Sequence, residues 1–216
     1  LSMIFSDIHY KKILWGIVIA SFLLSLVHSF YFRIEPSVDA GAYDRIAINV
    51  LNGYGYRQNF DLPFEKDNSI GRVGPGYEFF LVGVYFIFGR HFEAVWVLQA
   101  IFHALSVLLV FLISRKTIKV RLLEGSRTSP VVAGEFKAKP PEGGLALNCT
   151  PFFAAILFGF YPDLIIGSSM LLAETMAIFL MILSVFIFFR ILDKPGVKLT
   201  ILLGTIFALV VLVRTP

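Results

Sequence analysis

Long runs of apolar residues, separated by shorter polar stretches, dominate the pattern along the chain. The clearest runs cover residues 13–32, 94–114, 171–189 and 199–213. A helix of about 20 apolar residues crosses a hydrocarbon core of about 30 Å. The pattern therefore predicts membrane-spanning helices and leaves little material for a soluble domain.

The positions of basic residues predict how these helices are oriented, because cytoplasmic loops carry an excess of Lys and Arg. Lys11 and Lys12 precede the first run, and further basic clusters follow the runs that end at residues 114 and 189. The run 77–88 would be only about 18 Å long as a helix, which is too short to cross. With one more span from about residue 151, we expect about five spans and a cytoplasmic N-terminus.

Two polar segments separate the predicted spans. Residues 33–93 form an outer loop, and residues 115–150 form a basic cytoplasmic loop. Within the second loop, residues 124–144 are rich in Gly, Pro, Ser and charge, which is typical of a linker or a disordered segment. The fold class is therefore predicted to be an all-α polytopic membrane protein. It would form a single transmembrane module over residues 1–216.

The first part of the outer loop, 38–52, has the spacing of an amphipathic helix. Its apolar stripe consists of Tyr43, Ile46, Ala47, Val50 and Leu51. At about 100° per residue, Asp39 falls on this stripe, whereas Asp44 and Arg45 project elsewhere. A carboxylate on a membrane-facing stripe is costly unless it is paired or used. Asp39 either stabilises the positive end of the helix dipole or acts as a general base at the membrane surface.

A second feature of the outer loop is the sequence RVGPGY at residues 72–77, which leads into the second juxtamembrane helix. Its glycines and proline allow a sharp turn onto the membrane surface. Arg72 would then lie at phosphate depth, where a guanidinium can bind phosphate in bidentate fashion, although an ordinary interfacial anchor is the alternative. Glu78 interrupts the apolar run and is expected to snorkel outward.

Asp163 and Glu174 form an acidic pair near the predicted outer ends of their spans. An ionisable residue within a span indicates a functional role, so Glu174 has the stronger case. For Asp163, a loop cap after Pro162 is an equal alternative. His28, Gln99 and His103 are single polar groups on hydrophobic helices and are expected to form hydrogen bonds between helices.

Composition supports the membrane interpretation and limits which partners, disulfides and metal ligands are expected. Hydrophobic residues make up 57% and charged residues 16% of the chain, and the mean hydropathy is +0.78. The net charge of +4 fits loop bias, so no nucleic-acid partner is expected. The single Cys149 excludes an internal disulfide. No metal-ligand spacing or nucleotide loop is present, so a divalent metal is not indicated. Since the chain begins with Leu1 and stops directly after a hydrophobic run, we interpret it as a fragment or as a gene product that lacks its usual continuation.

The order of these motifs resembles the N-terminal portion of the C-type (GT-C) glycosyltransferases. It is most similar to the group of protein mannosyltransferases and lipid A aminoarabinose transferases. The matching stretches are 38–43 (VDAGAY), 51–56 (LNGYGY), 72–77 (RVGPGY), 88–89, 99–100, 161–162 and 171–175 (LLAET). The similarity covers most of residues 10–216, apart from about 122–147.

The resemblance implies an enzyme of the plasma membrane of a bacterium, with an active site that faces outward among membrane lipids. It would transfer a sugar from a polyprenyl-phosphate donor to a glycan, lipid or protein acceptor, with inversion. Asp39 would be the catalytic base, and no cofactor is implied. The substrate-binding residues would be Arg72, Glu174, Tyr43, Tyr77 and Asp163.

Two other functions remain open at this stage. In a transporter or flippase, Asp39, Asp163 and Glu174 would bind or relay ions. Such proteins usually place these groups near the midplane, on broken helices and within inverted repeats. The acidic residues instead cluster near the predicted outer rim and no repeat is visible, which favours the enzyme. The third possibility is a truncated, non-catalytic homologue.

Overall fold

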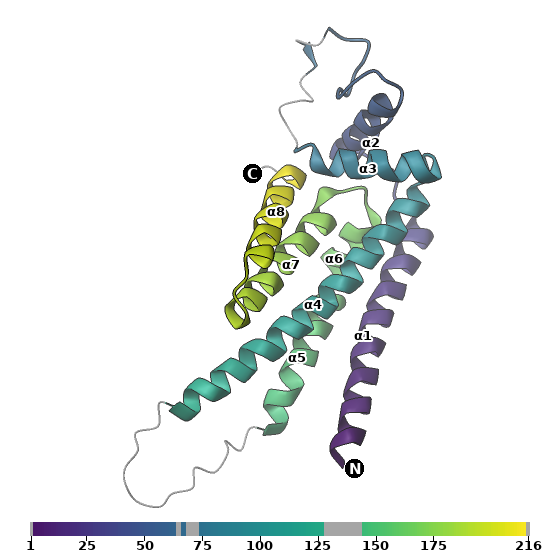
Figure 1. Ribbon diagram of the computed structural model, residues 1–216. Coiled ribbons are helices and arrows are strands. Elements are labelled where there is room, and N and C mark those ends of the chain that lie inside the picture. Colours follow the sequence, from purple (N-terminus) through teal and green to yellow (C-terminus); the bar gives the residue numbers. More distant parts are fainter. Residues whose placement is uncertain (1, 64–65, 68–73, 128–143, 215–216) are drawn as a thin grey trace, which may run out of the picture.

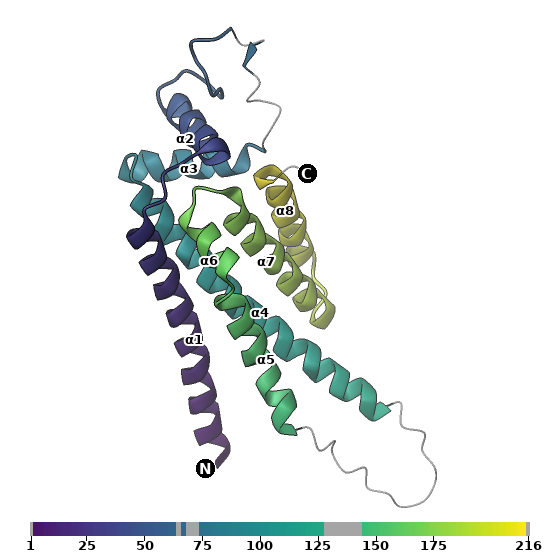
Figure 2. The same ribbon diagram turned by 180° about the vertical axis from the view of Figure 1, so that it is seen from behind.

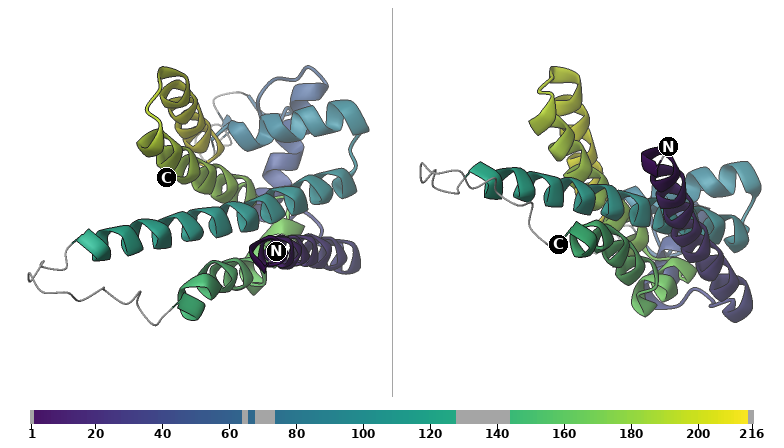
Figure 3. Two further views of the ribbon diagram at one scale, coloured as in Figure 1. Left: turned by 60° about the horizontal axis from the view of Figure 1, so that its bottom comes forward. Right: turned by 90° about the horizontal axis from the view of Figure 1, so that it is seen from below.

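The computed structural model describes residues 2–63, 66–67, 74–127 and 144–214, and within them the chain is helical, without strands (Figure 1). The helices are α1 (Ser2–Phe32), α2 (Val38–Leu51), α3 (Gly76–Phe88), α4 (Phe92–Arg127), α5 (Gly144–Gly159), α6 (Pro162–Ser169), α7 (Ala173–Asp193) and α8 (Val197–Val213). Helix α4 packs against α1, α5 and α7 (Figure 3).

Three helices are long and apolar enough to cross a membrane. They are His9–Phe32 within α1, Phe92–Ile118 within α4, and Ala173–Asp193. A fourth candidate consists of Cys149–Gly159 and Pro162–Ser169, which together form a span bent by 47°. The all-α membrane fold is thereby confirmed. Of the five expected spans, three or up to four are thus of spanning length. The fifth, α8, is a shorter apolar helix, whose 17 residues reach about 25 Å.

The bend between α5 and α6 has a local cause. Pro162 has no backbone N–H to continue the helix, and it disfavours helical backbone at the preceding Tyr161, which is extended (φ −69°, ψ 121°). Pro162 then begins α6, because its fixed φ suits the first helical position. Asp163 therefore lies in the first turn of α6 at this bend. If α5 and α6 form one span, Asp163 lies at its bend and not near its outer end, where the sequence placed it.

Helix α4 continues beyond the end predicted from hydropathy. Residues 115–127 extend it, and α5 begins at Gly144. The helix continues because 115–123 contain no glycine or proline that would end it. The prediction of a disordered segment over 124–144 is thus wrong for residues 124–127 and for Gly144. The rest of that segment lies outside the described residues.

Helices α2 and α3 lie together at one end of the bundle, where α1 ends and α4 begins (Figures 1 and 2). We call this the α3 end. The apolar stripe of α2 is buried at Tyr43, Ile46 and Ala47, and α2 packs against α3. The Tyr43 and Tyr77 rings meet edge to face with centroids 5.3 Å apart. The stripe therefore packs against protein, contrary to the expectation that it faces the membrane.

The start of α3 is in backbone contact with the end of α8. A Cβ on Gly76 would lie 2.8 Å from the carbonyl carbon of Leu212, and a Cβ on Gly74 would lie closer still to the Leu212 oxygen. Neither backbone can move aside without separating the helices, so only glycine fits. These glycines, predicted to form a turn, thus also allow two helices to touch and hold the end of α8 beside α3.

Replacing Gly76 with Ala should destabilise the protein. The added methyl group forces α3 and α8 apart, and overpacking of this kind costs about 1–3 kcal/mol. The matched control is Gly83→Ala on the same helix, since a Cβ at Gly83 meets nothing within 4 Å. Thermal unfolding in detergent should show a lower midpoint for Gly76→Ala alone. Equal midpoints for the two variants would contradict the close contact.

Candidate functional site

Segments distant in the sequence converge at the α3 end of the bundle. A pocket of about 170 Å³ is lined by residues 34–40, which precede and begin α2, and by residues 170–172, which join α6 to α7. Asp39 lines this pocket and is exposed. The carboxylate of Asp39, the candidate base, is thus accessible to a ligand in this pocket.

A larger pocket of about 380 Å³ lies among α4, α5, α6 and α7. Its lining is His103, Ser106, Phe158, Asp163, Leu164, Ile166, Gly167, Met170, Leu172, Glu174, Thr175 and Ile178. Met170 and Leu172 line both pockets, so one short segment separates them. The structure therefore brings Asp163 and Glu174 to one apolar pocket and Asp39 to the neighbouring one.

Glu174 lies in the first turn of α7 and pairs with Arg214 at the end of α8. Arg214 Nη1 lies 3.0 Å from Glu174 Oε1. The other oxygen, Oε2, is buried and has no hydrogen-bond partner among the described residues. Arg214 is half exposed, so it still has N–H donors available for an anion. Sequence analysis placed Glu174 near the outer end of its span but did not pair it with Arg214.

Both predicted tyrosines, Tyr43 and Tyr77, are buried. Burial, followed by the carboxylates of Glu174, Asp39 and Glu78, raises the pKa of Tyr43 to about 12. Tyr43 therefore keeps its proton at neutral pH and can act only as a neutral hydroxyl. Tyr77 is fully buried.

Polar side chains on the spanning helices join neighbouring helices, as expected. Gln99 Nε2 donates to the Tyr77 hydroxyl oxygen at 2.8 Å and to the Leu172 carbonyl at 3.1 Å. His103 Nε2 lies 3.1 Å from the Gly159 carbonyl oxygen. Tyr77 is thus linked to the 170–172 segment through Gln99. Its side chain is fully buried, so no part of it is exposed to a substrate.

Arg72, the predicted phosphate ligand, lies outside the described residues, so its position is not part of the site described here. Among the described residues, the guanidinium beside the acidic pair is that of Arg214.

Glu78 is buried instead of snorkelling outward, contrary to the sequence-based expectation. Tyr56 from the preceding loop donates a hydrogen bond of 2.9 Å to Glu78 Oε1. Burial raises the pKa of the Glu78 carboxyl. The helical pattern did not indicate this, because it cannot specify that a distant loop residue covers one face of α3.

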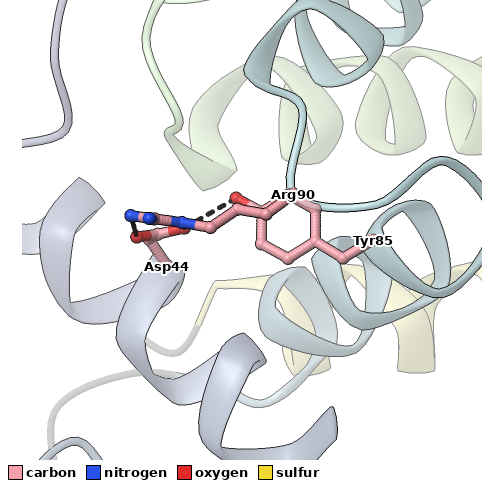
Figure 4. A network of polar contacts seen from close by, with 3 residues as sticks. All are labelled: Asp44, Tyr85 and Arg90. Carbon is pink, nitrogen blue, oxygen red and sulfur yellow. Dashed lines mark hydrogen bonds and ion pairs between the residues drawn. The ribbon is translucent and has the colours of Figure 1, made fainter.

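Asp44 is the centre of a polar network that sequence analysis missed (Figure 4). Its side chain is only 5% exposed. Tyr85 donates to Asp44 Oδ1 at 2.8 Å, and Arg90 donates to Oδ1 and Oδ2 at 3.2 and 2.6 Å. These hydrogen bonds raise the pKa of Arg90. The network fixes α2 to α3 and to the turn before α4.

Among the residues that the structure describes, no three His, Cys, Asp or Glu side chains come together as metal ligands. No family model, curated protein or solved structure matches the chain. The fold and the site together define a helical membrane protein with an acidic site beside two pockets at one end.

Removing the Asp44 carboxylate should loosen α2. Asp44→Asn weakens bonds to both Tyr85 and Arg90, so we expect about 1–3 kcal/mol of destabilisation, whereas Tyr85→Phe should cost about 1 kcal/mol. Because the two residues share one network, the double variant should lose less than the sum. Unfolding in detergent measures all three. Strict additivity, or an equal loss in the exposed control Asp61→Asn, would contradict the network.

Proposed function

We propose that this protein is a membrane glycosyltransferase that uses a polyprenyl-phosphate sugar donor, with Asp39 as the general base. The observation that best supports this is that Asp39 faces a pocket at one end of the bundle, beside the Glu174–Arg214 pair. A lipid-linked donor would reach this end from the bilayer surface, and a base for its transfer must lie there.

The proposed reaction is a single displacement. The Asp39 carboxylate accepts the proton of the acceptor hydroxyl as the hydroxyl oxygen attacks the anomeric carbon of the donor sugar. The bond between the anomeric carbon and the phosphate oxygen breaks, and its electron pair leaves with the lipid phosphate. Attack opposite the leaving group inverts the anomeric centre.

The departing phosphate needs positive charge nearby. Arg214 supports this role, since its guanidinium lies at the site and uses one nitrogen for Glu174. Arg72 remains the candidate from sequence. Glu174 would orient Arg214, and the neutral Tyr43 hydroxyl would donate a hydrogen bond to donor or acceptor oxygens.

The larger pocket would hold apolar parts of a substrate. Its lining is mostly apolar, and its polar groups include Asp163 and Glu174. In this proposal the donor lipid approaches between the helices and presents its phosphate to Arg214. Asp163 would then contact polar atoms of the sugar or acceptor.

A transporter or flippase is the second candidate, and the bend of 47° between α5 and α6 favours it. Broken helices near a polar site are typical of transporters. In that case Asp163 at the bend would be essential, and Asp39 would bind or relay ions and would not act as a base in sugar transfer.

The Asp39→Asn variant separates these functions. In the full-length protein in membranes, sugar transfer from a polyprenyl-phosphate donor should fall by about 100-fold or more in kcat, since a general base contributes about 10²–10⁴-fold. KM should change little, because asparagine preserves the shape of the pocket wall. Asp61→Asn, a change at an exposed loop residue, is the matched control.

Wild-type transfer by a well-inserted Asp39→Asn protein would contradict the assignment. Movement of the lipid across the bilayer without any sugar transfer, together with its loss in Asp163→Asn, would support the transporter instead.

A further inference from the structure

A second polar hollow adjoins the Asp39 pocket, with which it shares Glu35 and Pro36, and it extends along another face of α2. Its volume is about 380 Å³, and it is lined by Glu35, Pro36, Gly41, Asp44, Arg45, Arg90 and Phe92. At about 100° per residue, Gly41, Asp44 and Arg45 point away from Asp39 and Tyr43. The proposed reaction gives no role to the side chains of Glu35, Asp44, Arg45 or Arg90, although Glu35 also lines the Asp39 pocket.

Arg90 is a fixed cation in the wall of this hollow. Asp44 engages its Nε and Nη2 atoms, and the guanidinium carbon lies 5.3 Å from the centre of the Phe92 ring. A guanidinium has five N–H donors, and the Arg90 side chain is 56% exposed. Its Nη1 group therefore remains available to an anion, in an orientation that the protein has already set.

Arg45 supplies a second cation. Its Nη1 atom lies 3.7 Å from the point where a Cβ of Gly41 would be, so the side chain lies back over that glycine. Among the described residues, no ion pair or hydrogen bond involves its guanidinium. Two guanidinium groups from different elements thus line one hollow, and only Arg90 has a carboxylate partner.

Glu35 adds one negative charge at the rim of the same hollow. It is exposed, and within the described ranges no cation pairs with it. Because Asp44 and Arg90 neutralise each other, Arg45 and Glu35 leave a balanced positive and negative charge. Such a lining favours a ligand that itself carries both a phosphate and an ammonium group.

The surroundings of the hollow suit a lipid. It lies where α1 leaves the predicted membrane span and where α4 begins. Exposed aromatic side chains flank it in sequence, Tyr31 and Phe32 at the end of α1 and Phe86 and Phe88 at the end of α3. Aromatic residues at this depth are typical of the membrane interface.

We propose that this hollow binds the head group of a zwitterionic phospholipid of the phosphatidylethanolamine type. The phosphate diester accepts hydrogen bonds from Arg45 and Arg90, and the primary ammonium donates to Glu35. The acyl chains lie along the exposed aromatic residues of α1 and α3. This proposal does not depend on the proposed glycosyltransferase activity.

The test measures lipid binding by native mass spectrometry of the full-length protein in detergent. Phosphatidylethanolamine, phosphatidylcholine and phosphatidylglycerol with identical acyl chains are added in turn, and inorganic phosphate serves as competitor. The variants are Arg45→Gln and Glu35→Gln. Arg190→Gln, at an exposed arginine at the end of α7, is the matched control, and thermal unfolding verifies that each variant is folded.

Wild-type protein should bind phosphatidylethanolamine several-fold more tightly than either other lipid. Arg45→Gln should weaken binding of all three by about tenfold, which corresponds to one lost charge-assisted hydrogen bond. Glu35→Gln should abolish only the preference for phosphatidylethanolamine over phosphatidylcholine, since choline has no N–H to donate. Arg190→Gln should match wild type.

Several results would overturn the proposal. Unchanged lipid binding in a folded Arg45→Gln protein would exclude the guanidinium contact. A preference for phosphatidylglycerol would indicate a simple anionic site. Displacement of the lipid by millimolar phosphate would indicate a site for a free anion.

Discussion

The position of α2 depends on one buried carboxylate, that of Asp44. Three donor atoms, from Tyr85 and Arg90, converge on it, so the helix is fixed in rotation as well as in place. The apolar face of α2 packs on α3, yet apolar packing alone is non-directional. Asp39 lies on another face of the same short helix. The hydrogen bonds of Asp44 therefore also orient Asp39 toward the 170–172 segment.

A second constraint acts through glycine. Gly74 and Gly76 let the start of α3 touch the backbone of α8 at Leu212, and this contact holds the end of α8 at the α3 end of the bundle. Arg214 is thereby brought to Glu174. The two constraints together assemble a site from α2, α7 and α8, and Gln99 on α4 supports the 170–172 segment between its two pockets.

Hydropathy and helical spacing predicted the long apolar helices and the two helices of the outer segment, because these depend on local composition and period. Asp39 was placed on the apolar stripe of α2, yet it is exposed while the stripe is buried. These predictions failed for side chains whose position is set by a contact with a segment distant in the sequence. Asp44 was placed off the apolar stripe and Glu78 was expected to snorkel outward, but both are buried, and Arg90 and Tyr56 bind them from other segments. The bend at Pro162 was visible in the sequence as a proline, yet its consequence for Asp163 depended on where α6 continues.

The central claim is that residues 34–40 and 170–174 form one binding site for a lipid-linked sugar. The most direct measurement is photocrosslinking of the full-length protein in membranes with a polyprenyl-phosphate sugar that carries a photoreactive group on the sugar. Peptide mapping should find the label in both segments, and unlabelled donor should compete it away. Label that is confined to other segments, or that persists with excess unlabelled donor, would contradict the claim.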